Sequence, residues 1–152
     1  MNDTPSSKRN NPIPLRSAFS RWVSEQVRFS DTDMLGHVNN ASFAVYCETG
    51  RTQCILRHVM GDDTKGLVFV MARLTIDFTS EVHWPAQIDI GTAVLSIGRT
   101  SFQVGQGLFV GDQCVAIAEA SVVLIDAATR KPCVIPDVMR TRMNELLITP
   151  AG

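Results

Sequence analysis

The feature that most constrains this chain is residues 40–60, where apolar side chains recur at helical spacing and extend beyond one stripe. They are Ala41, Phe43, Ala44, Val45, Tyr46, Cys47, Cys54, Ile55, Leu56 and Val59. A helix that is apolar on most sides must be buried on most sides, so the rest of the chain has to wrap around it. Asn39 or Asn40 can cap its start, and Gly61 can end it. Gly50 within it costs about 1 kcal/mol relative to alanine, unless close packing there requires a bare backbone.

Five segments alternate between apolar and polar residues, which predicts strands. These segments are residues 22–29, 68–78, 88–97, 102–110 and 114–125. Turn residues separate the last four, and from Leu67 onward we expect only strands and turns. The last strand is apolar on both faces, so we expect it to lie centrally. One short strand, one long helix and four long strands predict an α+β fold, in which a curved antiparallel sheet wraps around the helix.

Length and composition predict one domain and exclude several classes of partner. Residues 1–18 hold three of the 7 prolines and few large apolar groups, which predicts a flexible N-terminal arm before a single domain, 19–152. The net charge of -1 offers no surface for a polyanion, so we expect no nucleic-acid partner. No stretch approaches a membrane span, and the 4 cysteines show no C-x-x-C spacing. We therefore expect a cytoplasmic protein without a membrane partner.

The loop at residues 31–40 concentrates polar groups at the start of the predicted helix. It holds Asp31, Asp33, His37, Asn39 and Asn40. Free N–H groups and the positive end of a helix dipole can stabilise an oxyanion, while a nearby carboxylate attacks a carbonyl or activates water. This arrangement predicts an acyl-transfer site. The alternative is that the aspartates only shape a turn and the asparagines only cap the helix, and spacing alone leaves both interpretations open.

Metal binding is not expected from this sequence. The run that begins with Asp31, Asp33 and Gly36 starts like a calcium loop, but Leu35 and Ser42 stand where such a loop needs an oxygen ligand and a bidentate glutamate. The three histidines have no zinc-ligand spacing.

Residues 22–136 resemble the 4-hydroxybenzoyl-CoA thioesterase-like branch of the hotdog superfamily. The resemblance is carried by the run from Val27 to Arg51, which contains Asp31-Thr-Asp-Met-Leu-Gly-His-Val-Asn-Asn40, and by Leu74-Thr-Ile-Asp-Phe78, Ile97-Gly-Arg-Thr-Ser-Phe102 and Val123-Leu-Ile-Asp126. It implies a hotdog fold and a thioesterase that needs no cofactor. It also implies a homodimer or homotetramer that binds acyl-CoA or acyl-carrier-protein thioesters at the subunit interface.

The resemblance assigns catalytic roles to three residues of the loop. The second aspartate of the family's Asp-x-Asp motif falls on Asp33, the expected nucleophile or general base, and the backbone N–H that polarises the thioester carbonyl falls on Asn40. Plant acyl-carrier-protein thioesterases share a similar run in which the histidine is functional, which makes His37 a second candidate. Those enzymes carry an asparagine two positions after the aspartate, and here that position is Leu35. A complete Asp-Asn-His set is therefore not expected.

Further residues are candidates for substrate binding. Phe43 and Tyr46 are expected to line the acyl pocket, and Glu48, eight positions after Asn40, to face it or to pair with Arg51. Arg99 and Ser101 resemble positions near the pantetheine strand, and Arg130 with Lys131 can meet the coenzyme A phosphates. Two other functions remain open from sequence: a hotdog hydratase or dehydratase, and a non-catalytic acyl-CoA-binding domain.

Overall fold

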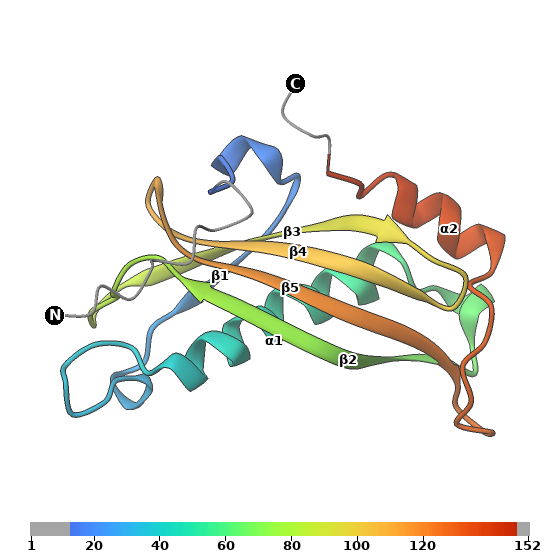
Figure 1. Cartoon of the computed structure of the whole chain (residues 1–152), viewed down its shortest axis with the longest axis horizontal. Coiled ribbons are helices and arrows are strands. Elements are labelled where there is room, and N and C mark those ends of the chain that lie inside the picture. Colours follow the sequence, from blue (N-terminus) through green and yellow to red (C-terminus); the bar gives the residue numbers. More distant parts are fainter. Residues whose placement is uncertain (1–12, 149–152) are drawn as a thin grey trace, which may run out of the picture.

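In a computed structural model that describes residues 13–148, a five-stranded antiparallel sheet wraps around one long helix (Figure 1). The strand order is β1-β3-β4-β5-β2, so β1 and β2 form the two edges. The elements are β1 (Arg21–Gln26), α1 (Asn40–His58), β2 (Leu67–Phe78), β3 (Gln87–Ile97), β4 (Ser101–Val110), β5 (Gln113–Asp126) and α2 (Asp137–Asn144). The α+β architecture is the one predicted from the sequence.

The central helix α1 begins and packs as its sequence predicts. Asn39 is the N-cap, and its side-chain oxygen accepts the N–H of Ala41 at 2.8 Å. Gly50 is required by packing, because a Cβ at this position would lie 2.5 Å from Cγ2 of Ile90 on β3. The bare backbone lets the sheet approach the helix closely, which explains a glycine in the middle of α1.

Two apolar clusters lie between the sheet and the helices, one toward each end of α1. The cluster near the start of α1 includes Val38, Phe43 and Tyr46. The cluster near its end includes Ile55 and the side chains that α2 contributes. The apolar cluster near the start of α1 therefore holds the helix terminus and the loop before it in place.

The structure corrects two predictions of secondary structure. The first strand ends at Gln26, and Phe29 lies in a 3-10 turn with 73% of its surface exposed, so the apolar alternation does not continue to residue 29. The stretch after β5 is not only turn, because α2 forms there and buries Met139 and Met143 fully. Its other residues are polar apart from Val138, so the apolar signal was too short to predict a helix. The last long strand, β5, lies inside the sheet between β4 and β2.

The proposed N-terminal arm lies only partly within the described residues. Residues 1–12 fall outside them, so the prediction of flexibility stays a prediction there. Residues Arg16–Ala18 form a 3-10 turn, and Arg16 pairs with Asp89 at 2.9 Å and covers the Trp22 ring at 4.4 Å. Within residues 13–148 no helix has the length and apolar character needed to cross a membrane.

Candidate active site

The loop before α1 is a short closed turn whose ends pair with each other. Thr32 and Val38 form an isolated β-bridge, and inside it the N–H of Asp33 donates to the carbonyl of His37 at 3.0 Å. Gly36 turns the chain with a φ of 85°, a conformation that favours glycine, and its N–H donates to the carbonyl of Asp33 at 3.0 Å. These hydrogen bonds fix the backbone conformation of the loop that carries Asp33 and His37.

The Asp33 carboxylate uses one of its two oxygens to shape this turn. Its Oδ1 accepts the N–H of Leu35 at 2.9 Å, which is an Asx turn. Within residues 13–148 no donor reaches Oδ2, and the side chain is half-buried. The turn-forming interpretation of Asp33 and the catalytic one are therefore compatible, because one oxygen fixes the orientation and the other remains available.

Asp31 anchors the loop to the helix. Its carboxylate accepts the backbone N–H of Arg28 at 2.9 Å and the hydroxyl of Tyr46 at 2.6 Å. Its carbonyl accepts the N–H of Asn39 at 2.8 Å and the hydroxyl of Ser42 at 3.2 Å. Burial, together with the Asp31 carboxylate, raises the pKa of Tyr46 well above its usual value, so this phenol stays a neutral donor. Tyr46 was expected to line an acyl pocket, and the structure places its hydroxyl on Asp31.

Asn40 is the first residue of α1, and its backbone N–H group is available as a hydrogen-bond donor. The N–H of Ala41 is taken by the Asn39 side chain, and that of Ser42 donates to the Asn39 carbonyl at 2.9 Å. The N–H of Asn40 has no acceptor in the part of the chain that the structure describes. Of the first three N–H groups of the helix, this is the one left open at the positive end of the helix dipole.

A second polar segment, between β2 and β3, supports the loop from outside. The N–H of Val38 donates to the carbonyl of Val82 at 2.7 Å, and Nδ1 of His83 lies 2.9 Å from the carbonyl oxygen of Gly36. Glu81 lies between the two imidazoles, 4.0 Å from Nε2 of His37 and 3.6 Å from Nε2 of His83. Glu81 and His83 cannot be linked to the loop from sequence, because more than 40 positions separate them from it in the chain.

A protein-family model described as the thioesterase-like superfamily matches residues 27–143. The chain belongs to this superfamily. The match spans both the loop and the sheet, so it covers the elements that position Asp33 and Asn40. The expected identification as a hotdog thioesterase, a thioester hydrolase, is confirmed.

Similarities to individual proteins are consistent with membership of this superfamily. The acyl-CoA thioester hydrolase YbgC of Escherichia coli O157:H7 is 25% identical over 126 residues, which cover 80% of this chain and 93% of the relative. A thioesterase of Thermus thermophilus, solved in complex with coenzyme A and zinc, superposes with a TM-score of 0.77 at 27% identity, covering 88% of this chain and 98% of that one. Protein PA5185 of Pseudomonas aeruginosa PAO1 superposes with a TM-score of 0.82 at 22% identity, covering 92% and 100%. This last likeness bears on the fold alone.

An open groove runs between α1 and the edge strand β2 of this thioesterase. Its volume is about 350 Å³, within the range of small-molecule sites. The lining residues are Glu48, Arg51, Thr52, Ile55, Leu56, Met60, Leu67, Val68, Phe69, Met71 and Val122. Apolar side chains dominate, and the polar ones gather near the middle of α1. Glu48 lines this groove; its predicted role at the acyl pocket stays a prediction.

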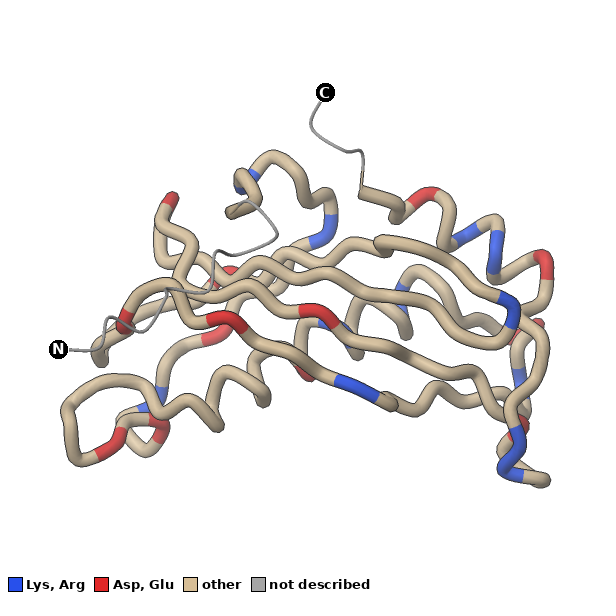
Figure 2. The backbone as a smooth tube through the Cα atoms, viewed as in Figure 1, with Lys and Arg blue, Asp and Glu red and all other residues tan. Residues whose placement is uncertain are grey.

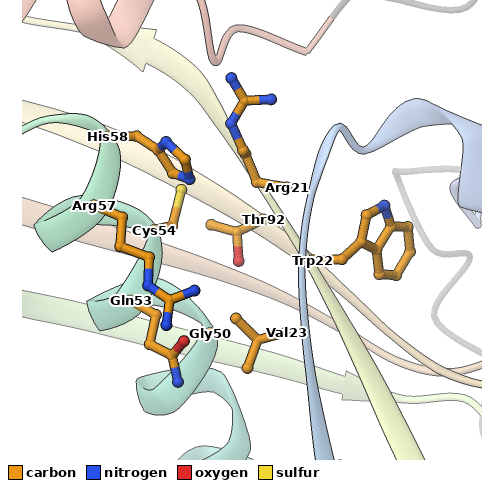
Figure 3. Close-up of a pocket in the computed structure, with 9 residues that line it drawn as sticks. All are labelled: Arg21, Trp22, Val23, Gly50, Gln53, Cys54, Arg57, His58 and Thr92. Atoms are coloured by element: carbon orange, nitrogen blue, oxygen red, sulfur yellow. The ribbon is translucent and has the colours of Figure 1, made fainter.

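A second, much smaller pocket lies on the other flank of α1, against β1. Its volume is about 20 Å³, which is room for little more than a water molecule. Arg21, Arg57 and His58 contribute to its lining, and Figure 3 shows the Arg21 and Arg57 side chains extending in opposite directions. The guanidinium groups do not converge, so this pocket is too small for an acyl group and is not arranged to hold an anion.

Four of the remaining predicted residues of the thioesterase lie far from the loop. Arg99 and Ser101 stand at the turn from β3 to β4, and Arg130 and Lys131 follow β5. This turn and the exit from β5 lie at the end of the sheet opposite to the loop before α1, and Figure 2 shows basic residues gathered there. Phe43 stays near the loop, buried with its ring 5.3 Å from that of Phe78 at the end of β2. One chain therefore does not bring all predicted site residues together.

Proposed function

We propose that the protein hydrolyses acyl-CoA thioesters, with Asp33 as nucleophile or general base and the Asn40 N–H as the donor to the thioester carbonyl oxygen. The observation that carries this proposal is the open N–H of Asn40, the first of α1, next to a loop that orients a carboxylate with one unbonded oxygen. The relatives add the substrate class, because one is named an acyl-CoA thioester hydrolase and another was solved with coenzyme A.

Asp33, Asn40 and His37 each contribute to one step of the proposed reaction. Oδ2 of Asp33 attacks the thioester carbonyl carbon, or removes a proton from a water that attacks it. Negative charge then develops on the carbonyl oxygen, where the Asn40 N–H and the helix dipole stabilise it. The C–S bond then breaks, and in this proposal His37, with Glu81 4.0 Å from its Nε2, protonates the leaving thiolate. Where Asp33 has attacked directly, water hydrolyses the resulting acyl–Asp33 anhydride, which releases the carboxylic acid and restores the Asp33 carboxylate.

A second copy of the chain completes the substrate site in this proposal. The outer edge of β2 has no partner strand among the described residues, and the groove beside it is open. Two copies related by a two-fold axis across β2 run antiparallel, so the catalytic loop of one copy comes to the end of the sheet that carries Arg99, Ser101, Arg130 and Lys131 in the other. These residues then bind pantetheine and the phosphates of coenzyme A. The resulting unit is a homodimer, alone or within a homotetramer.

A thiol-release assay over short, long and aromatic acyl-CoA substrates, and matching acyl-carrier-protein thioesters, tests the proposed function. We expect saturable hydrolysis of at least one acyl-CoA. A folded protein that cleaves no thioester in this panel but binds acyl-CoA would replace the proposal with the acyl-CoA-binding function. Hydration of an enoyl-CoA without thioester cleavage would replace it with the hydratase function.

A further inference from the structure

His83 lies in the connection between β2 and β3, and its side chain contacts the loop that carries Asp33. Its Nδ1 lies 2.9 Å from the carbonyl oxygen of Gly36. A carbonyl oxygen only accepts hydrogen bonds, so Nδ1 carries the hydrogen and donates it. Within residues 13–148 no backbone N–H group donates to this carbonyl. His83 therefore supplies a hydrogen bond to Gly36 that the loop itself does not provide.

The backbone that carries His83 is anchored on both sides of it. The N–H of Val38 donates to the carbonyl of Val82 at 2.7 Å, and the N–H of Val27 donates to the carbonyl of Ala86 at 2.9 Å. Val82 is buried in the apolar cluster near the start of α1. The side chain of His83 is exposed, but it extends from a segment that is fixed to the core and to β1.

Gly36 links this contact to the carboxylate of Asp33. The N–H of Gly36 donates to the carbonyl of Asp33 at 3.0 Å, and the N–H of the preceding Leu35 donates to Oδ1 of Asp33 at 2.9 Å. Glycine has more backbone freedom than any other residue, so a hydrogen bond from outside restricts the turn at its least constrained position. Movement of this turn would redirect Oδ2, and a misplacement of about 1 Å can lower the rate of a reaction ~100-fold.

We propose that His83 is a positioning residue of this thioesterase: its Nδ1–H holds the Gly36 carbonyl and thereby keeps the Asp33 carboxylate directed at the thioester. The inference rests on the proposed function, in which Asp33 carries out the hydrolysis. His83 acts through the loop and does not touch the reacting atoms, in contrast to the role proposed for His37.

The competing explanation is that His83 acts through Glu81 and His37 and not through Gly36. Nε2 of His83 lies 3.6 Å from Oε2 of Glu81, whose Oε1 lies 4.0 Å from Nε2 of His37. Both distances exceed those of a hydrogen bond, whereas the distance from Nδ1 to the Gly36 carbonyl is that of a good one. The geometry therefore favours the contact with Gly36.

Two substitutions of His83 separate the explanations. In His83→Asn the side-chain nitrogen takes the position of Nδ1, so it can donate to Gly36 but does not reach Glu81. In His83→Gln the side-chain nitrogen takes the position of Nε2, so it can donate to Glu81 but not to Gly36. Both variants lose the imidazole, and neither leaves a cavity because the side chain is exposed. His58→Gln, at the end of α1 away from the loop, is the control for the loss of a histidine.

The experiment measures kcat and KM for thiol release from the best acyl-CoA substrate, and amide hydrogen exchange in the loop by NMR. We expect His83→Gln to lower kcat ~10- to 100-fold while KM stays within ~3-fold of the wild type. In the same variant the amides of Asp33 and Gly36 should exchange at least ~10-fold faster. His83→Asn and His58→Gln should keep kcat within ~3-fold, together with the wild-type exchange rates.

Wild-type kcat in His83→Gln would overturn the inference, and so would a loss of kcat without faster exchange of the loop amides. An equal loss of kcat in His83→Asn would also overturn it, because the imidazole would then act through Glu81 or by itself. In all three cases the wild type still hydrolyses the thioester, so the proposed function stands. A wild type that cleaves no thioester would instead refute the proposed function.

Discussion

Replacing Asn40 with proline removes the proposed oxyanion donor and little else. Asn40 is the first residue of α1, where proline is favoured because its fixed φ suits the helix and its missing N–H has no helical partner. The preceding Asn39 has φ -63° and ψ 141°, an extended conformation that is compatible with a following proline. The Asn40 side chain is exposed, so its loss leaves no cavity. The substitution therefore isolates one N–H group.

The expected effect follows from the role of that group. Removing one oxyanion donor typically lowers kcat by ~10²–10³-fold, which corresponds to about 2.7–4 kcal/mol of transition-state stabilisation. The free energy of unfolding should change by less than ~0.5 kcal/mol, as for most exposed sites. The measurements are kcat and KM from thiol release on the best substrate and unfolding in urea.

Asn40→Ala is the matched control, because it removes the same side chain and keeps the backbone N–H. We expect it to retain kcat within about threefold of the wild type, since the helix N-cap is Asn39. Wild-type kcat in the folded proline variant, or an equal loss in the alanine variant, would refute the assignment of the N–H group.

Two further substitutions test the support of the loop and of the helix. Tyr46→Phe removes the 2.6 Å hydrogen bond to Asp31. We expect the free energy of unfolding in urea to fall by about 1–2 kcal/mol and kcat to be lower. An unchanged free energy of unfolding would show that this bond does not hold the loop. Gly50→Ala adds a Cβ that would lie 2.5 Å from Ile90, so we expect a loss of about 1–3 kcal/mol and a lower Tm, although alanine is the better helix former. A rise in Tm would show that the helix can move away from the sheet without cost.

The fold was predictable where one periodicity extends over a long segment. The apolar positions of α1 and the alternation in the strands after Leu67 define faces that only a sheet around a helix can bury. The helix α2 was missed because it buries two methionines among polar residues and is only 8 residues long. Phe29 was wrongly assigned to β1 because alternation does not show where a strand ends.

The candidate site was predictable only in its local part. Asp33 and Asn40 stand in one loop and at one helix terminus, so the sequence places them together. The bond from Tyr46 to Asp31 and the contact of His83 with Gly36 depend on the folded path of the chain, which spacing does not reveal. The sequence suggests Arg51 only as a partner for Glu48 within its own helix, and spacing does not reveal that Arg51 is buried.

The most direct test of the account compares Asp33→Asn with the wild type. The asparagine oxygen can still accept the N–H of Leu35, so the Asx turn is preserved while the negative charge is lost. Asp112→Asn, in the exposed turn between β4 and β5, is the matched control. We predict that thiol release by folded Asp33→Asn falls ~10²–10⁴-fold while the control keeps wild-type activity. Wild-type activity in folded Asp33→Asn would contradict the central claim that the Asp33 carboxylate carries out the hydrolysis.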